Sequence, residues 1–404
     1  MAEMTTPPRE PFRLSQLLYD ARYRSLTIQV VAAILIMLLL VELVDNTVTN
    51  LAALGKDIGF GFLWSTAGYD INQQLIPFSS QDTHARAALV GILNTLLVAA
   101  LGCVLATVIG VLAGVLRLSK NWLVARIMTF YVEAMRNTPL LIWILIVFAV
   151  MTEATPQPRE FRDGGGASMI LWDSVAVTNR GVYMPKPVWA EGSGLVLAVF
   201  VLSIIGIFLL RSFARKRQEA TGAQLPVFRL SLVLFFVPAV LAYFVMGRPI
   251  SLEYPELGGF NFAGGVQIRN SFIALWLALS LYTSAFIAEI VRSGILAVSK
   301  GQTEAAFALG IQPNRTMQLI ILPQALRVII PPLISQYLNL TKNSSLAIAV
   351  GYMDVRSTLG GITINQTGRE LEGMLLLGVF YLITSLLIST FMNLYNSSVK
   401  LKER

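Results

Sequence analysis

The chain is poor in charge, in cysteine and in histidine. Of its 404 residues only 13% are charged and 55% are hydrophobic, whereas soluble domains carry roughly 25% charged residues. The single cysteine, Cys103, excludes an intrachain disulfide or thiolate metal site and is predicted to be a small packing residue. The single histidine, His84, is predicted to be an ordinary loop residue before the second apolar run. These shortages indicate a membrane protein.

Signatures of catalysis are also missing. No G-x-x-x-x-G-K-[ST] loop occurs, so the chain lacks the glycine-rich loop with which many proteins bind ATP. Neither H-E-x-x-H nor G-x-S-x-G is present, and this disfavours an intramembrane hydrolase. We therefore expect a chain that is not an enzyme, with no catalytic residues, no metal site and no bound cofactor.

Long uncharged runs are what the sequence does contain. A crossing of about 30 Å of hydrocarbon needs about 20 residues. Runs suited to this occur at 87–116, 193–210, 230–247, 270–288 and 373–399. Shorter or interrupted runs, the first at 27–44, bring the total to about eight. The prediction is an all-α polytopic membrane protein whose surface contacts lipid.

The net charge of +8 is concentrated in three segments. Basic residues cluster before the run at 27–44, at 211–217 directly after the run at 193–210, and at the end of the chain. Lysine and arginine collect in cytoplasmic loops and orient the helices. We read them this way, with no nucleic-acid partner, which puts both termini in the cytoplasm. The loop at 152–192 is then external although it contains arginines, and its length suggests a small ordered insertion.

Small residues and prolines predict how the spans pack and bend. Gly102, Ala106, Gly110 and Gly114 recur at intervals of four, which places them on one helix face for close contact with another helix. In the third span, which begins near Trp122, Pro139 should bend or break the helix. The seventh span contains Pro331 and Pro332, its uncharged run ends at Lys342, and the apolar "NSSLAIAVGYM" follows; this pattern predicts a helix broken within the membrane.

The polar residues after that proline pair form a candidate translocation gate. These residues are Asn339, Thr341, Lys342, Asn343 and Ser344. Their side chains offer hydrogen-bond donors for a carboxylate and acceptors for an ammonium. The alternative interpretation is a polar cap on a broken helix.

Two carboxylates near the ends of spans carry partners three residues away. Glu289 precedes Arg292, and either a substrate path or a structural i to i+3 ion pair fits this spacing. Glu133 precedes Arg136 beside the Pro139 break, and there the structural pair is favoured.

The stretch "EAAFALGIQPNRTMQLIILP", residues 304–323, reads instead like part of a soluble protein. Ser299 and Gln302 have the spacing of a capping box. Gly310 suits the left-handed end of a helix, and Pro313 suits the first turn of the next. Two helices meeting at a sharp turn would present small side chains to a groove on another protein. The alternative is an ordinary cytoplasmic turn.

Glu304-Ala305-Ala306, then Gly310, then Ile320-x-Leu322-Pro323 resembles the EAA signature of bacterial ABC-importer permeases at every spaced position. The stretches "YVEAMRNTPLL" and "AFIAEIVRSGI" are similar to the polar-amino-acid branch, whose members carry His, Glu, Gln, Arg or opines. The similarity covers roughly residues 87–150 and 269–396. An extra first span and a large insertion are most like the longer permease of the general L-amino-acid importers.

The resemblance implies a type I importer permease core in the bacterial inner membrane. In that family this segment is the coupling helix, which docks on a separate ATPase. The implied coupling residues are Glu304, Ala305, Ala306, Gly310 and Pro323. The implied partners are an ABC ATPase dimer holding ATP and Mg, a periplasmic amino-acid-binding protein and a second permease. The lengthened external loops favour a different second permease, hence a heterodimer.

These observations divide the chain into segments. Residues 1–26 and 397–404 are cytoplasmic tails, and 27–86 hold the extra span and an external loop. The permease domain is 87–396, with the insertion at 152–268 and the cytoplasmic coupling region at 294–323. The alternative function is an ion-coupled secondary amino-acid transporter, with Glu289 and Glu133 as coupling carboxylates; no inverted repeat supports it.

Overall fold

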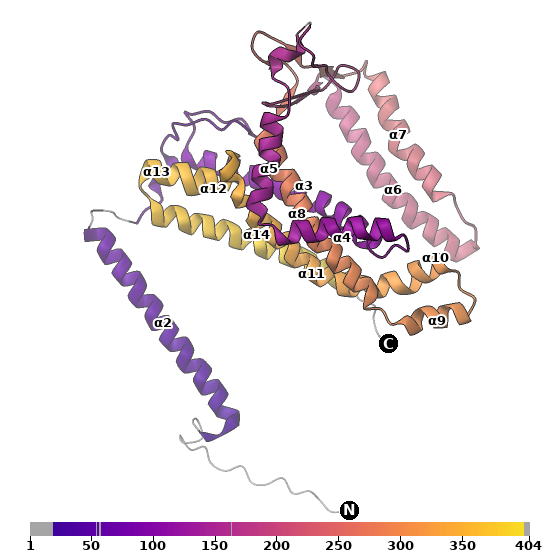
Figure 1. Ribbon diagram of the computed structural model, residues 1–404, viewed down its shortest axis with the longest axis horizontal. Helices are drawn as coiled ribbons and strands as arrows, with labels where there is room; N and C mark the ends of the chain where they lie inside the picture. Colours follow the sequence, from indigo (N-terminus) through magenta and orange to yellow (C-terminus); the bar gives the residue numbers. More distant parts are fainter. Residues whose placement is uncertain (1–18, 54, 56–57, 163, 400–404) are drawn as a thin grey trace, which may run out of the picture.

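The computed structural model describes residues 19–53, 55, 58–162 and 164–399, so most of the predicted 1–26 tail and the end of the 397–404 tail lie outside the described residues. Within them, seven helices are long and apolar enough to cross a membrane, and a bent pair gives an eighth (Figure 1). The prediction of about eight spans is confirmed.

The helices follow the predicted apolar runs. The long ones are α2 (Ala21–Ala53), α3 (His84–Leu116), α6 (Ser193–Thr221), α7 (Val227–Val245), α8 (Asn270–Leu296), α11 (Leu322–Asn343) and α14 (Glu370–Val399). The bent pair is α4 (Trp122–Asn137) and α5 (Leu140–Glu153), and the short helices are α9 (Lys300–Ala308), α10 (Pro313–Thr316), α12 (Val355–Ser357) and α13 (Ile364–Thr367). Tighter or wider turns occur at Gly61–Trp64, Pro158–Phe161, Met317–Ile321, Ser344–Val350 and Thr358–Thr363.

Short antiparallel strands join two segments that are far apart in sequence. The strands are β1 (Ala176–Thr178), β2 (Gly181–Met184), β3 (Lys186–Trp189), β4 (Ile250–Glu253), β5 (Glu256–Leu257), β6 (Phe262–Ala263) and β7 (Val266–Ile268). They form sheets in the orders β1-β2-β7, β3-β4 and β5-β6, with Val182 opposite Ile268. The sheets close the insertion over one end of the helices, which we name the strand end. The sequence predicted an ordered insertion but not these strands.

The core lies where α3, α5, α8 and α11 meet. All four small residues of the predicted stripe on α3 are buried. A Cβ on Gly110 would lie 2.6 Å from the Cβ of Ile287, and one on Gly114 would lie 2.7 Å from the carbonyl oxygen of Ala288. Real Cβ contacts are never this short, so the backbones of α3 and α8 touch only because these side chains are absent. The packing prediction is confirmed.

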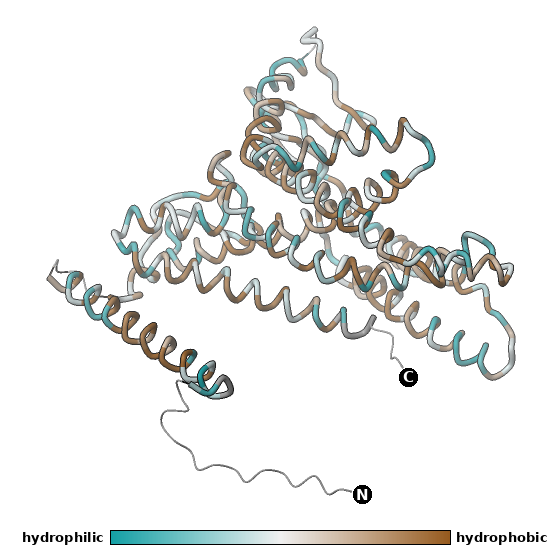
Figure 2. Tube along the Cα trace, turned by 60° about the horizontal axis from the view of Figure 1, so that its bottom comes forward, coloured by the Kyte–Doolittle hydropathy of each residue, from teal (hydrophilic) through white to brown (hydrophobic). Residues whose placement is uncertain are grey.

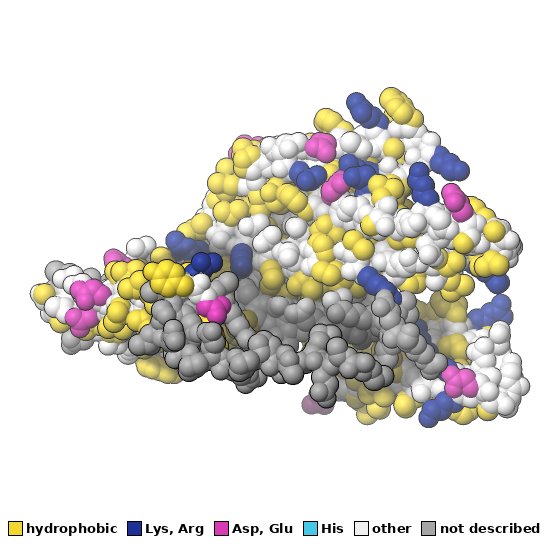
Figure 3. Space-filling view, turned by 90° about the horizontal axis from the view of Figure 1, so that it is seen from below, with side chains coloured by type: hydrophobic (Ala, Val, Ile, Leu, Met, Phe, Trp, Pro, Cys, Tyr) yellow, Lys and Arg dark blue, Asp and Glu magenta, His cyan; other side chains and the backbone are white. Residues whose placement is uncertain are grey.

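Other helices lie outside this core. The α6–α7 hairpin packs mainly on itself, and none of the apolar window of α2 is buried. Figure 2 shows hydrophobic residues along α2, and Figure 3 shows hydrophobic side chains spread over the visible face, with charged side chains scattered among them. Such surfaces suit a lipid or protein environment.

Three local predictions meet different outcomes. The break at Pro139 is confirmed, because α4 and α5 meet at 107° there. α11 continues through Pro331 and Pro332, which are exposed, and ends at Asn343, directly after Lys342, where a 3₁₀ turn, Ser344–Val350, follows. The α-helix thus ends where the sequence predicted the break. The prediction for His84 was wrong. His84 is the first residue of α3 and is only 2% exposed. Its Nδ1 lies 3.0 Å from the Oγ1 of Thr363, a residue far along the chain that packs against it.

Gly110→Ala should lower the free energy of unfolding by about 1–3 kcal/mol, because the new methyl group pushes α3 away from α8. The measurement is the midpoint of thermal unfolding in detergent. Gly378→Ala on α14 is the matched control, since a Cβ there meets nothing within 4 Å. Equal midpoints for the two variants would contradict the close-packing account.

Candidate coupling and translocation sites

The sharp turn predicted from the sequence exists at the end of the bundle opposite the strands, to which α8 runs from β7. We name residues 300–316 the elbow. α9 ends in a Schellman motif: the Gly310 N–H donates to the Phe307 carbonyl at 2.9 Å, and the Ile311 N–H donates to the Ala306 carbonyl at 3.0 Å. Gly310 has a φ of 71°, and Pro313 begins α10. The left-handed conformation predicted for Gly310 and the helix start predicted at Pro313 are both confirmed.

The surface of the elbow is more apolar than its alanines suggested. Glu304 and Ala305 are exposed, but Ala306 is only 1% exposed and packs inward. Phe307 is 52% exposed and Leu309 is 79% exposed. Sequence reasoning missed these two residues because they sit inside an apparently small-residue motif. Exposed apolar side chains of this size suit contact with lipid or with another protein.

The predicted capping box does not form. Ser299 precedes α9 as expected, but its side chain caps no backbone N–H. The Gln302 side chain turns instead toward α11, where its Oε1 accepts a hydrogen bond from the Gln324 Nε2 at 3.4 Å. Pro323 lies in the first turn of α11. It follows a π turn at Met317–Ile321, whose wider winding accommodates the missing proline N–H at the start of α11.

Glu289 lies between two arginines near the elbow end of α8. Its Oε1 accepts from Arg292 Nη2 at 2.6 Å, and its Oε2 accepts from Arg117 Nη1 at 2.5 Å. Arg117 ends α3 and its side chain is only 9% exposed. The cluster therefore ties the ends of α3 and α8 together, as a structural ion pair does. The spacing predicted the Arg292 contact, but Arg117 is 172 residues away and left no local signal.

The predicted ion pair between Glu133 and Arg136 was wrong. The Arg136 guanidinium lies over the ring of Phe286, 5.4 Å from its centre. Glu133 accepts instead from the Asn137 side chain at 3.2 Å, one helical turn along α4. An aromatic face on the neighbouring helix competes for the guanidinium, and no i to i+3 spacing could reveal it.

The five candidate gate residues point in two directions. Thr341 and Ser344 are buried, and their hydroxyls donate to the carbonyls of Tyr337 and Thr341 at 2.8 and 2.7 Å. Thr341 also borders a largely apolar cavity of about 550 Å³ between α3, α11 and α14. Asn339 and Lys342 are exposed, and Asn343 is partly exposed. Two of the five residues thus bond to the backbone of the preceding helical turn, and the other three lie on the outward side of α11.

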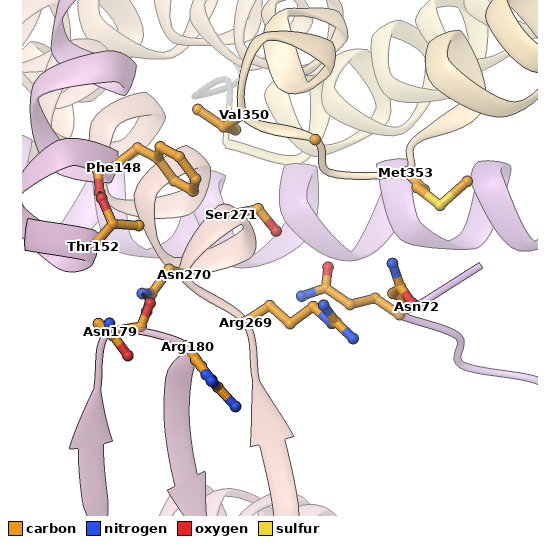
Figure 4. Close-up of a pocket in the computed structure, with 12 residues that line it drawn as sticks. Asn72, Phe148, Thr152, Asn179, Arg180, Arg269, Asn270, Ser271, Val350 and Met353 are labelled. Carbon is orange, nitrogen blue, oxygen red and sulfur yellow. Dashed lines mark hydrogen bonds between the residues drawn. The ribbon is translucent and has the colours of Figure 1, made fainter. Parts of the chain in front are cut away.

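A polar pocket of about 220 Å³ lies at the strand end, which the sequence did not predict. Figure 4 shows its residues converging from the loop before α3, the end of α5, the β1–β2 turn, the start of α8 and the segment after the 3₁₀ turn. We define the polar pocket by Asn72, Gln73, Asn179, Arg180, Arg269 and Asn270. Because its residues come from separate segments, no motif marks it.

Asp354 lies next to this region and is fully buried. Its Oδ1 accepts from the Ser357 N–H at 2.8 Å and caps α12. Burial raises the pKa of this carboxyl to about 6, against the hydrogen bonds from Ser357, which lower it.

Residues 221–401 match the family model described as "Binding-protein-dependent transport system inner membrane component". The chain is 54% identical to the "Glutamate/glutamine/aspartate/asparagine transport system permease protein BztB" of Rhodobacter capsulatus, and the match covers 100% of both chains.

Two further relatives also match over almost their whole length. The "General L-amino acid transport system permease protein AapQ" of Rhizobium johnstonii is 45% identical, covering 96% of this chain and 95% of the relative. The "Putative amino-acid ABC transporter permease protein YhdX" of Escherichia coli K12 is 42% identical, covering 94% and 95%.

Glu289→Gln should destabilise the fold by about 1–3 kcal/mol, because Arg117 and Arg292 lose their anionic acceptor. Thermal unfolding in detergent measures this. The double variant Arg117→Gln with Glu289→Gln should lose less than the sum of the two single changes, since the residues share one interaction. A Glu289→Gln chain of wild-type stability but altered transport would instead make Glu289 part of the substrate path.

Asp354→Asn should remove a pH dependence of stability. The folded-state pKa of about 6 lies above the ordinary value of 3.8, so this group's contribution is complete below about pH 4 and is lost as the pH rises through 6. Asparagine keeps the cap without a charge. The unfolding midpoint of the wild type, relative to that of the variant, should therefore fall between about pH 4 and pH 7. A constant difference would contradict the raised pKa.

Proposed function

Since the chain belongs to the family of binding-protein-dependent transport system inner membrane components, we propose that it carries L-amino acids across the bacterial inner membrane. It is a permease subunit of an ABC importer, with a polytopic helical fold of the type I permease kind. Three relatives named for amino-acid transport, each matched over nearly the whole chain, support this class of substrate.

The elbow is the single observation that carries the mechanism. It projects beyond the membrane helices, its conformation is fixed by the Schellman motif, and Phe307 and Leu309 are exposed on it. These features suit insertion into a groove of an ATPase. The coupling residues are Glu304, Ala305, Ala306, Gly310 and Pro323, now joined by Phe307 and Leu309. Movement of the groove would move the elbow and, through it, α8 and α11.

ATP and Mg belong to the partner ATPase in this proposal. The chain has no glycine-rich phosphate loop, so it needs a separate subunit to use ATP. Substrate reaches the strand end from an amino-acid-binding protein. This orientation puts both termini and the elbow in the cytoplasm and the insertion at 152–268 outside, within a permease domain of residues 87–396.

A second permease completes the path. The exposed polar face of α11, formed by Asn339, Lys342 and Asn343, has no cover within the described chain and would line the path between two permeases. The alternative of an ion-coupled transporter gains no support, because Glu289 is held by two arginines and Glu133 by Asn137. Both carboxylates have structural partners.

Phe307→Asp and Gly310→Asp should each weaken association with the ATPase about tenfold or more, because a charge replaces an apolar or open position at the centre of the docking surface. The measurement is the amount of ATPase that co-purifies with tagged chains in mild detergent, together with its hydrolysis rate.

Phe260→Asp is the matched control, because Phe260 is 90% exposed but lies at the strand end, in the loop between β5 and β6. It should leave both readouts unchanged. If the elbow variants retain the ATPase and full transport, the elbow is an ordinary turn.

A further inference from the structure

The polar pocket at the strand end has the chemistry of a binding site. We propose that it holds an L-amino acid by its α-carboxylate and α-ammonium before the amino acid enters the membrane path, and that it favours acidic side chains. The inference rests on the proposed function, which makes the strand end the outer face.

Positive charge dominates the lining. Arg180 comes from the β1–β2 turn and Arg269 immediately precedes α8, and none of the described residues that line the pocket is acidic. Arg180 uses Nη1 to donate to the Phe260 carbonyl at 3.3 Å, which leaves its other donors available. Burial raises the pKa of the nearby Tyr183, while both arginines oppose that rise through their charge. Two guanidinium groups can bind two carboxylates, as acidic amino acids provide.

Three residues that line the pocket also carry side-chain oxygens that accept no hydrogen bond within the described chain. Among the described residues, the side-chain oxygens of Gln73, Asn179 and Asn270 are buried and have no hydrogen-bond partner. Asn270 is only 4% exposed, and its Nδ2 donates to the carbonyls of Met151 at 3.0 Å and Asn179 at 2.8 Å. These bonds fix the orientation of the Asn270 amide, and its oxygen is left without a hydrogen-bond donor. An ammonium supplies three donors, which matches this set.

The apolar part of the wall restricts what fits. Phe148 and Val350 line the same pocket of about 220 Å³, so a small zwitterion is a better match than a peptide or a lipid tail. The pocket also lies where two long helices begin or end. α8 starts at Asn270, and α11 leads through the 3₁₀ turn to Val350. Both helices run to the elbow. Binding of an amino acid in the pocket and docking of the ATPase at the elbow would therefore both act on α8 and α11.

The test is protection of a cysteine in the complete transporter, purified without its binding protein. In a Cys103→Ser background, Asn72→Cys places an exposed thiol at the pocket edge, and Gln74→Cys places a matched thiol two residues away outside it. The rate of reaction with a neutral maleimide is measured with and without L-glutamate. At about twice its Kd, L-glutamate should slow labelling of Asn72→Cys about threefold and leave Gln74→Cys unchanged.

Arginine variants and analogues complete the design. Arg269→Gln or Arg180→Gln should raise the protecting concentration about tenfold, whereas Arg159→Gln, an exposed arginine of the same insertion, should not. Protection by L-lysine equal to that by L-glutamate would overturn the preference for acidic side chains. Equal protection by glutarate, which has no ammonium, would overturn the role of the amide oxygens.

Failure of the pocket and failure of the proposed function give different results. A complex that takes up L-glutamate but shows no protection overturns the pocket alone. A complex that takes up no amino acid, with no ATPase bound, overturns the proposed function. If the arginine variants instead raise the binding-protein concentration needed to stimulate ATP hydrolysis, without changing protection, the arginines dock that protein and the pocket proposal is wrong.

Discussion

The direct contact between the backbones of α3 and α8 is the constraint on which the rest of the protein depends. In a bilayer, lipid competes equally for apolar side chains, so helices associate through close packing of small residues. Gly110 and Gly114 allow that approach. With α8 fixed against α3, its first residue is held at the strand end and its last turn at the elbow, so the helix links these two ends of the bundle.

Polar interactions secure the two ends of that helix. At the elbow end, Glu289 joins Arg117 of α3 to Arg292 of α8. At the strand end, Asn270 joins the end of α5 and the β1–β2 turn to the start of α8. Buried polar groups of this kind are costly unless they are paired, so each specifies one arrangement of its neighbours. The elbow and the polar pocket are therefore both built on a rigid element.

The insertion has a clear physical role in this arrangement. Its strands satisfy their backbone groups by pairing across distant segments, as β2 does with β7. That pairing brings Arg180 beside Arg269, although 89 positions of sequence separate them. The β1–β2 turn thus supplies one arginine of the polar pocket, and the residue before α8 supplies the other.

The sequence by itself determined what depends on neighbouring residues. Hydropathy located the spans, Pro139 located the bend, and Gly310 with Pro313 located the elbow, because each acts through its own backbone. The remaining features depend on the tertiary structure. The burial of His84, the partner of Arg136 and the convergence of the polar pocket depend on contacts between segments far apart in the chain. Such contacts follow from packing, which leaves no pattern in a single stretch of residues.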